Sequence, residues 1–365
     1  MRDFALIRTY SKQNSYYKIR QGRFKRRSLP EIDMIWFLEG QSSQREVIIG
    51  ARDALPASVK IIASHRQQRS EITGQADVAL QEPIDNEERI DWVLETARSL
   101  GVKTIVAGRV GGIYEAQRAR FVAEGLDLVT GGTSLQTFLD VDDKSRFTAA
   151  AEAAGLACIP AITACNTEEL QAAYDALSVS GEVCIKPVVG IYGRGFWRFK
   201  TDVDDFRCFA NPDARETTFQ AYLNAYRQAD ERPAMLLMPY MPGNECSVDM
   251  VCEHGKAVAF VGRRKVGLNQ TFERDSEAVQ LAVRAAEHFA CDGLINVQTR
   301  DDADGTPRLL EINPRYSGGI GYTRETGVNL PGIFAARRLG LKEPETHWLE
   351  DIRVKAITVA VRATV

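Results

Sequence analysis

The chain has 365 residues, of which 44% are hydrophobic and 26% charged, a composition typical of a globular protein with room for about two or three packed units. Its formal net charge of −3 is too small to indicate a nucleic-acid or membrane partner, and no apolar run approaches the roughly 18 residues that span a bilayer. Seven scattered cysteines without a CxxC pair and four isolated histidines argue against a disulfide framework and a His-based metal site, so we expect a soluble cytoplasmic protein.

Residues 1–33 differ from the rest of the chain because lysine and arginine dominate them and apolar periodicity is poor. We therefore expect a basic N-terminal extension without a packed element. Two interpretations stay open: a basic arm that binds RNA or another anionic surface, or a non-native extension ahead of a natural start at Met34. The lack of a recognisable nucleic-acid motif favours the second interpretation.

From Met34 onward, short apolar strands alternate with helices. The expected strands are residues 35–38, 59–63, 76–80 and 102–107. The expected helices are residues 43–55, with Ser43 as N-cap, and 87–100, which has one apolar face. This alternation predicts a parallel sheet covered on both faces, that is, a small doubly wound, Rossmann-like domain over residues 34–140.

Gly108, Gly111 and Gly112 follow the last of these strands and should open another helix. Their spacing is not GxGxxG, and no acidic residue ends a second strand at the right distance. A tight turn from strand to helix is therefore favoured over a dinucleotide site. A ligand pocket at the carboxyl ends of the strands stays open as a second interpretation.

Residues 141–340 mix both element types in a less regular order, which predicts an α+β unit. The expected helices are residues 143–155 and 276–291. The expected strands are residues 183–187 and 234–238, the pair 245–251 and 257–261, and the pair 295–300 and 308–313 around the Asp304-Gly305 turn. We expect residues 341–365 to add a helix or strand that closes the domain.

Three polar side chains on the last pair of strands predict an oxygen-rich surface. Gln298 lies on one strand, and Glu311 and Asn313 lie two residues apart on the next, so Glu311 and Asn313 share a face. One carboxylate and two amide oxygens suit Mg²⁺, which shares its coordination sphere with waters and phosphate. Arg315 follows and can hold a carboxylate or phosphate through two hydrogen bonds. A solvated strand face is the alternative.

Two further segments suggest a nucleotide. Lys186 ends a strand before a loop with Gly190, Gly193 and Gly195, where backbone N–H groups and the ammonium suit phosphate, although a flexible hairpin turn is the alternative. The segment from Leu236 to Glu245 places Tyr240 and Met241 beside an extended backbone that suits an adenine ring, with a carboxylate for ribose hydroxyls. Each signal is weak by itself.

Together and in this order, the motifs resemble those of the ATP-grasp superfamily over roughly residues 141–340. The likeness is greatest to the large-subunit halves of carbamoyl-phosphate synthetases, which also have glutamine at the position of Gln298. The resemblance rests on Asp143-Lys144 at a helix start, Lys186-Pro187 with the glycine loop, Pro239-Tyr240-Met241 through Glu245, Ile295-Asn296-Val297-Gln298, Glu311-Ile312-Asn313-Pro314-Arg315, and Thr326-Gly327. It implies a two-lobed ATP-grasp domain preceded by the small α/β domain.

The resemblance also implies roles for these residues. Lys144 and Lys186 would contact ATP phosphates, with Gly190, Gly193 and Gly195 as a mobile lid. Tyr240 and Met241 would lie at the adenine, and Glu245 at the ribose. Gln298, Glu311 and Asn313 would hold Mg²⁺, or Mn²⁺ in its place, and Arg315 would steady the transferred phosphoryl group. Pro239 replaces an acidic residue that is frequent in the family, which puts the adenine contacts there in doubt.

The activity implied is an ATP-dependent ligase that joins a carboxylate on a small molecule or peptide to an amine or thiol through an acyl phosphate. One alternative is phosphorylation of bicarbonate or carbamate, as in a carbamoyl-phosphate synthetase half. The other is a regulatory module that binds ATP without turnover. The family analogy further suggests a homodimer. Candidate acceptor contacts are Tyr192, Arg194, Trp197, Tyr316, Tyr322 and Arg324.

Overall fold

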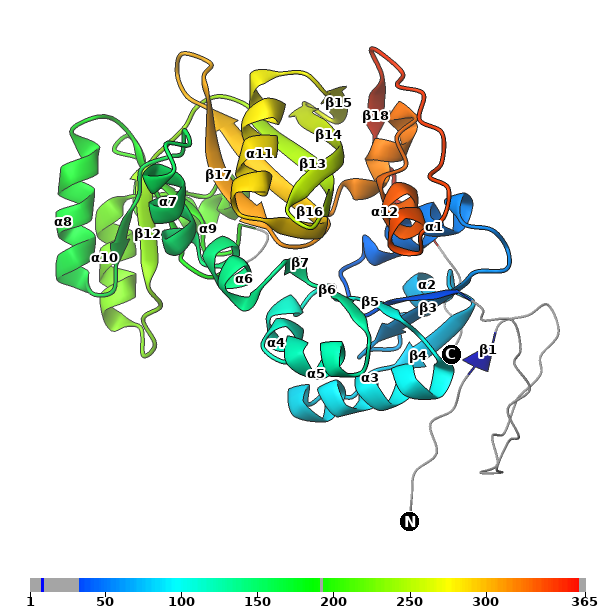
Figure 1. Ribbon diagram of the computed structural model, residues 1–365. Coiled ribbons are helices and arrows are strands. Elements are labelled where there is room, and N and C mark those ends of the chain that lie inside the picture. The colour runs from blue at the N-terminus through cyan, green and yellow to red at the C-terminus, as the bar shows by residue number, and fades with distance from the viewer. Residues whose placement is uncertain (1–7, 10–32, 191–192, 361–365) are drawn as a thin grey trace.

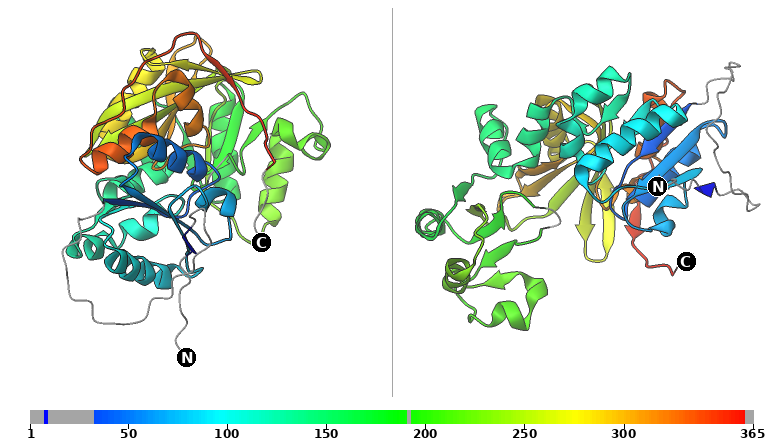
Figure 2. Two further views of the ribbon diagram at one scale, coloured as in Figure 1. Left: turned by 90° about the vertical axis from the view of Figure 1, so that its right-hand side faces the viewer. Right: turned by 90° about the horizontal axis from the view of Figure 1, so that it is seen from below.

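The computed structural model describes residues 8–9, 33–190 and 193–360. They form three sheets of six, five and seven strands, each with its own helices (Figure 1). The five-stranded unit, on the left of Figure 1, projects away from the other two, as the right-hand view of Figure 2 also shows. No helix of these described residues is long and apolar enough to cross a membrane.

The N-terminal domain is a six-stranded sheet in the order β1-β4-β3-β2-β5-β6, in which β2 to β6 run parallel and β1 pairs antiparallel with β4. Its strands are β1 (Arg8–Thr9), β2 (Met34–Phe37), β3 (Lys60–His65), β4 (Val78–Gln81), β5 (Thr104–Val106) and β6 (Asp127–Val129). Its helices are α1 (Gln44–Ala54), α2 (Ser70–Thr73), α3 (Asn86–Leu100), α4 (Gly111–Glu115) and α5 (Arg118–Ala123). The doubly wound parallel sheet expected from the sequence is confirmed.

The five-stranded unit, which we call the lobe, has the strand order β11-β10-β9-β12-β8. Its elements are β8 (Ile162–Ala164), α8 (Thr167–Ser178), β9 (Val183–Pro187), β10 (Trp197–Phe199), α9 (Arg207–Ala210), η1 (Pro212–Ala214), β11 (Glu216–Thr217), α10 (Phe219–Gln228) and β12 (Met235–Pro239). A separate core of Phe199, Phe219, Leu223 and Leu237 stabilises the lobe.

The third unit is a seven-stranded sheet in the order β17-β16-β13-β14-β15-β18, to which β7 adds by pairing with β16. Its strands are β7 (Gly131–Gly132), β13 (Glu245–Glu253), β14 (Lys256–Val266), β15 (Asn269–Glu273), β16 (Cys291–Asp301), β17 (Pro307–Asn313) and β18 (Arg353–Lys355). Its helices are α6 (Leu135–Asp142), α7 (Lys144–Ala153), α11 (Glu277–His288), η2 (Ile320–Thr326) and α12 (Leu330–Arg338). The sequence-based boundary after residue 140 falls inside α6.

Backbone hydrogen bonds tie both ends of the lobe to neighbouring strands of this sheet. Where the chain runs toward the lobe, the Ile159 N–H donates to the Leu309 carbonyl at 3.1 Å, next to the isolated bridge between Cys158 and Leu309. Where the chain returns, the Gly243 N–H donates to the Asp301 carbonyl at 3.1 Å. The lobe is thus an insertion whose first end is bonded to β17 and whose second end is bonded to β16.

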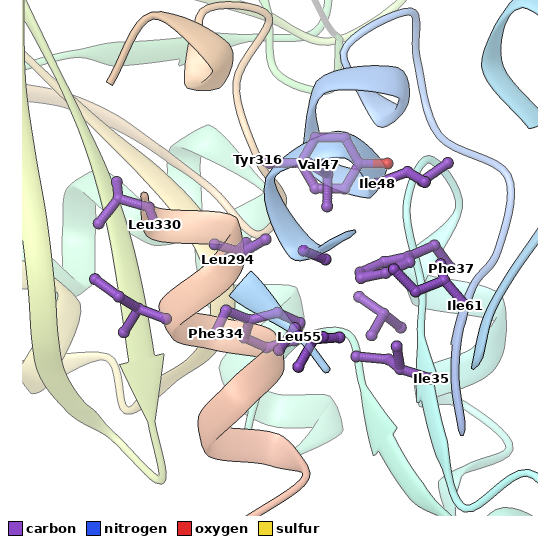
Figure 3. Packing of buried hydrophobic residues seen from close by; sticks show 14 of the residues in the cluster. Ile35, Phe37, Val47, Ile48, Leu55, Ile61, Leu294, Tyr316, Leu330 and Phe334 are labelled. Carbon is purple, nitrogen blue, oxygen red and sulfur yellow. The ribbon is translucent and has the colours of Figure 1, made fainter. Parts of the chain in front are cut away.

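The N-terminal domain and the seven-stranded unit share one hydrophobic core, shown in Figure 3. Phe37 and Ile48 from the first pack in one cluster with Leu294 and Phe334 from the second. Helix α12 lies beside α1 and brings Phe334 into the cluster, where it is 1% exposed. Because apolar burial drives association, these two units behave as one body.

Several local expectations need correction. Ser43 precedes α1, but its hydroxyl makes no capping bond, whereas Asp143 and Ser276 do cap α7 and α11. Helix α11 ends at His288, and Cys291 already belongs to β16. By contrast, residues 341–360 contain the strand β18, one of the two element types expected there. Arg8–Thr9 form a strand rather than unpacked chain, and the rest of the 1–33 prediction, apart from Asp33, lies outside the described residues.

Candidate functional site

A cavity of about 520 Å³ lies between the lobe and the seven-stranded sheet. Strands β9 and β12 of the lobe form one side, and β13, β16 and β17 form the other. All residues predicted to contact the nucleotide, the metal or the transferred phosphoryl group, except Gly195, line this cavity: Lys144, Lys186, Gly190, Gly193, Tyr240, Met241, Glu245, Gln298, Glu311, Asn313 and Arg315. Of the candidate acceptor contacts, Arg194 and Tyr316 line it, and Trp197, Tyr322 and Arg324 do not. Segments more than 100 residues apart in the sequence therefore meet at one place.

The oxygen-bearing side chains lie opposite each other on two antiparallel strands. Gln298 on β16 pairs in register with Glu311 on β17, and Asn296 pairs with Asn313. The Asn313 amide donates to Glu311 Oε1 at 3.3 Å, and Arg315 donates to Asn313 Oδ1 at 2.9 Å. The shared face predicted from the alternation of strand residues is present, and it faces the cavity.

Two lysines from different units converge on the Glu311 carboxylate. Its Oε2 lies 3.6 Å from Lys144 Nζ and 3.7 Å from Lys186 Nζ. Burial lowers the pKa of Lys186, an effect that Glu311 opposes and Lys144 reinforces. One carboxylate thus lies among three cationic groups, since Arg315 also lines the cavity. The balance of charge suits a polyanion such as a polyphosphate.

The glycine loop between β9 and β10 has a backbone that requires glycine. Gly193 and Gly195 have φ angles of 59° and 73°, in the left-handed region that side chains disfavour. A Cβ at Gly195 would also lie 2.8 Å from the Pro187 ring, so this glycine packs against the strand end rather than lining the cavity. Lys144 Nζ donates to the Gly190 carbonyl at 3.0 Å and ties the loop to α7. Tyr192 lies outside the described residues.

The segment after β12 forms the far end of the cavity. The Tyr240 N–H donates to the Glu182 carbonyl at 2.7 Å, and the Arg198 guanidinium lies 3.9 Å from the ring centroid of Tyr240. Arg300 Nε donates to the Met241 carbonyl at 2.8 Å. Apolar wall residues are Ile159, Cys184, Phe196, Met238 and Leu310. We call the part of the cavity that these apolar residues line the apolar slot.

Glu245 opens β13 directly after this segment. Burial raises the pKa of its carboxyl, while Arg300 lowers it. No ion pair within 4.0 Å engages Glu245 among the described side chains. Its carboxylate can therefore accept hydrogen bonds from hydroxyl groups of a molecule in the slot.

A buried polar network beside Gln298 was missed by the sequence reasoning. Asn296 donates to Ser247 Oγ at 2.9 Å and to Asp249 Oδ1 at 3.0 Å, and Arg263 lies 3.7 Å from Asp249 Oδ2. Burial raises the pKa of the Asp249 carboxyl, and Arg263 lowers it. The signal was available, because Asn296 lies two residues before Gln298 on the same face.

We expect Asn296→Leu to destabilise the protein by about 2–3 kcal/mol, since it removes a donor from the fully buried Asp249 carboxylate. Urea unfolding followed by circular dichroism measures this free energy. The control is Asn224→Leu on α10, where an exposed amide oxygen accepts hydrogen bonds from the side chains of Gln220 and Arg227 on the same helix. Equal stability of the two variants would show that the network contributes nothing.

The metal-binding capacity of the site rests on oxygen alone. Within residues 8–9, 33–190 and 193–360, no group of three or more His, Cys, Asp or Glu side chains is placed to hold an ion. On the paired strands β16 and β17, the cavity offers one carboxylate, from Glu311, with the amide oxygens of Gln298 and Asn313. Such a weakly charged set suits an ion that completes its shell with waters and phosphate oxygens.

Comparison with known proteins agrees with this geometry. A family model described as ATP-grasp in the biosynthetic pathway with Ter operon matches residues 231–360. Carnosine synthase 1 from Mus musculus and its counterpart from Homo sapiens are each 35% identical over an alignment of 117 residues that covers 27% of this chain. The chain spans only 14% of the length of these curated relatives.

Solved structures resemble nearly the whole chain. An ADP complex of N5-carboxyaminoimidazole ribonucleotide synthetase superimposes with a TM-score of 0.63 at 20% identity, covering 88% of this chain and 80% of that one. The biotin carboxylase domain of Hydrogenobacter thermophilus 2-oxoglutarate carboxylase gives a TM-score of 0.62 at 17% identity, covering 88% and 72%. These relatives do not favour the carbamoyl-phosphate-synthetase branch. The likeness to an ATP-grasp family model thus covers residues 231–360, and nearly the whole chain shares the fold of these solved enzymes.

Proposed function

We propose that this protein is an ATP-dependent ligase that joins a carboxylate to an amine through an acyl phosphate. The observation that carries the proposal is the position of Glu311, opposite Gln298 on the paired strands and between Lys144 and Lys186. A strand face that served only solubility would gain nothing from two largely buried lysine side chains converging on one carboxylate. A site that binds and transfers a phosphoryl group needs this combination.

The nucleotide would lie along the cavity. Tyr240 and Met241 would contact the adenine in the apolar slot, and Glu245 would accept hydrogen bonds from the ribose. Lys144 and Lys186 would contact the phosphates under the loop of Gly190, Gly193 and Gly195. The presence of apolar wall residues and of a cationic cluster in one cavity supports this placement. ADP in the solved N5-carboxyaminoimidazole ribonucleotide synthetase complex is consistent with it.

Gln298, Glu311 and Asn313 would hold the metal, for which Mg²⁺ is our first choice and Mn²⁺ a substitute. Their oxygen-only donor set fits a hard cation, and MgADP occurs in the biotin carboxylase relative. When bound, the ion neutralises charge on the β- and γ-phosphates. Arg315 would steady the transferred phosphoryl group, because its guanidinium already reaches the Asn313 side chain.

The reaction has two steps. A carboxylate oxygen of the donor attacks the γ-phosphorus, the bond to the β,γ-bridging oxygen breaks, and ADP leaves. The amine nitrogen then attacks the acyl carbon, the C–N bond forms, and the C–O bond to phosphate breaks. Of the two protons that an ammonium acceptor loses, one ends on phosphate and one in solvent at neutral pH. Lys186 and Arg315 would stabilise the charge that develops on the phosphoryl oxygens.

The other candidate functions receive less support. The relatives do not favour phosphorylation of carbamate, and a module that only binds ATP would not need the full set of Lys144, Lys186, Glu311, Asn313 and Arg315. A thiol acceptor, a homodimer and a cytoplasmic location remain predictions from the family resemblance.

The test is release of ADP and phosphate with Mg²⁺ across a panel of carboxylates, each combined with amines or thiols. We expect release above background for specific pairs, with one amide formed per ADP as seen by mass spectrometry. Release without acceptor, together with carbamoyl phosphate when bicarbonate and ammonia are supplied, would favour the synthetase alternative. ATP binding without turnover for every pair would favour the regulatory module.

A further inference from the structure

A second cavity, of about 290 Å³, lies where the N-terminal domain meets the C-terminal end of β17. Its lining includes Arg109, Phe138, Asp142, Pro314 and Arg315. Gly108 to Ile113, which follow β5, also line it. The sequence had left open a ligand pocket at the carboxyl ends of these strands.

The strand order places this cavity where an open parallel sheet forms a crevice. From β2 the chain proceeds outward to β3 and β4, and then returns to the other side of β2 for β5 and β6. The carboxyl ends of β2 and β5 are therefore a topological switch point, the usual place for ligands in such sheets. Gly108 packs there against the Glu39 carbonyl, where a Cβ would lie 2.4 Å from the oxygen.

Arg315 lines both cavities, so the second opens beside the phosphate end of the first. A molecule in the second cavity would have one end at the guanidinium proposed to steady the phosphoryl group. A volume of about 290 Å³ is at the lower limit of typical ligand pockets, roughly 300–1,000 Å³, so the occupant is small.

Charged groups of both signs line the second cavity. The Arg109 guanidinium is 42% exposed, and its nearest carboxylate is Glu39 at 3.8 Å. Glu39 is already engaged by a hydrogen bond from Arg66, so Arg109 keeps donors for another anion. Asp142, at the end of α6, accepts no hydrogen bond from the described side chains, although Arg315 and Lys144 lie near enough to lower the pKa that burial raises.

We propose that the second cavity is the acceptor subsite and that it selects a small amine carrying an anionic group. Asp142 holds the ammonium beside Arg315, and Arg109 holds the carboxylate, sulfonate or phosphonate at the other end. Apolar contact with Val110, Ile113 and Phe138 suits a short linking chain. This inference rests on the proposed ligase function for its acceptor role, and it adds the substrate class.

The first experiment compares matched acceptors, each pair differing mainly in the anionic group: glycine with glycinamide, and taurine with ethanolamine. With the full chain, Mg·ATP and an active carboxylate donor, we expect KM to be about tenfold lower for the anionic member. Arg109→Gln should raise the KM of that member about tenfold and remove the difference, and Arg109→Lys should restore part of it. Arg120→Gln is the control, since Arg120 pairs with Asp91 on the surface.

The second experiment does not depend on turnover. Saturation-transfer NMR with taurine and ethanolamine reports binding to wild type, Arg109→Gln and Arg120→Gln. A taurine signal that is lost in Arg109→Gln but kept in Arg120→Gln supports the subsite. If this result is obtained and no donor–acceptor pair is turned over, the subsite is supported and the ligase function is overturned. Turnover of neutral and anionic amines alike, unchanged by Arg109→Gln, overturns the inference and leaves the ligase function standing. No turnover and no Arg109-dependent taurine signal overturn both.

Discussion

Glu311→Gln is expected to lower kcat for ADP formation by about 10²–10³-fold. The carboxylate lies 3.6 Å from Lys144 Nζ and 3.7 Å from Lys186 Nζ, opposite Gln298. A glutamine keeps the shape of the side chain but removes the only carboxylate of the proposed metal site. The two ammonium groups would then repel each other, and the metal would lose its one charged ligand. The measurement is steady-state ADP release at saturating ATP with Mg²⁺ varied.

The matched control is Glu253→Gln, which removes a carboxylate from the same sheet at the opposite end of β13. Glu253 pairs with Arg337 and does not line the cavity. We expect this control to retain wild-type ADP release. ATP affinity, measured by equilibrium dialysis, should decrease in Glu311→Gln only by the amount that the bound metal contributes to ATP binding. Wild-type turnover in Glu311→Gln would remove Glu311 from the metal site.

Phe334→Ala is expected to lower the free energy of unfolding by about 3–5 kcal/mol. The ring is 1% exposed, and its cluster holds the N-terminal domain and the seven-stranded unit together. A cavity at this position removes packing contacts with both the N-terminal domain and the seven-stranded unit. We therefore expect the parallel sheet and the seven-stranded sheet to unfold in one transition at a lower urea concentration. Hydrogen exchange read by mass spectrometry shows whether β2 and β16 lose protection together.

The comparison variant is Phe199→Ala, in the separate core of the lobe. Phe199 is 3% exposed and is equivalent in size to Phe334. It should lower protection in β9 and β12 while β2 and β16 stay protected. If Phe334→Ala unfolds the N-terminal domain alone, the two units are independent and the shared core does not couple them.

The fold and the site differ in how much of each the sequence predicts. The pairing of Gln298 with Glu311 was predictable, because strand alternation and a short turn fix which side chains share a face. Lys186 and the glycine loop were recognisable because glycine is needed where φ is positive. The contact between Lys144 and Glu311 could not be predicted from local sequence patterns, because the two residues meet only through tertiary folding.

The elements and residues that the sequence did not predict are also those that local sequence patterns do not reveal. Asp249 lies on a strand that is buried on both faces, so apolar alternation does not distinguish it. Asn296 shares the face of Gln298, but its contact with Asp249 forms only when β13 pairs with β16. Strand β15 and helices α8 and α10 were not predicted, although α10 has a Thr218 cap and a buried face. The second cavity depends on Arg109 and Arg315, which lie more than 200 residues apart and become neighbours only through the shared core.

The two hydrogen-bonded ends of the lobe have a consequence for how such proteins diversify. Ile159 is fixed to Leu309 and Gly243 to Asp301, on adjacent strands. An inserted module whose ends are held side by side can be exchanged, enlarged or trimmed without altering the register of the sheet beneath it. A chimaera that replaces residues 160–242 with the corresponding lobe of a relative should therefore keep the frame intact while changing the nucleotide preference.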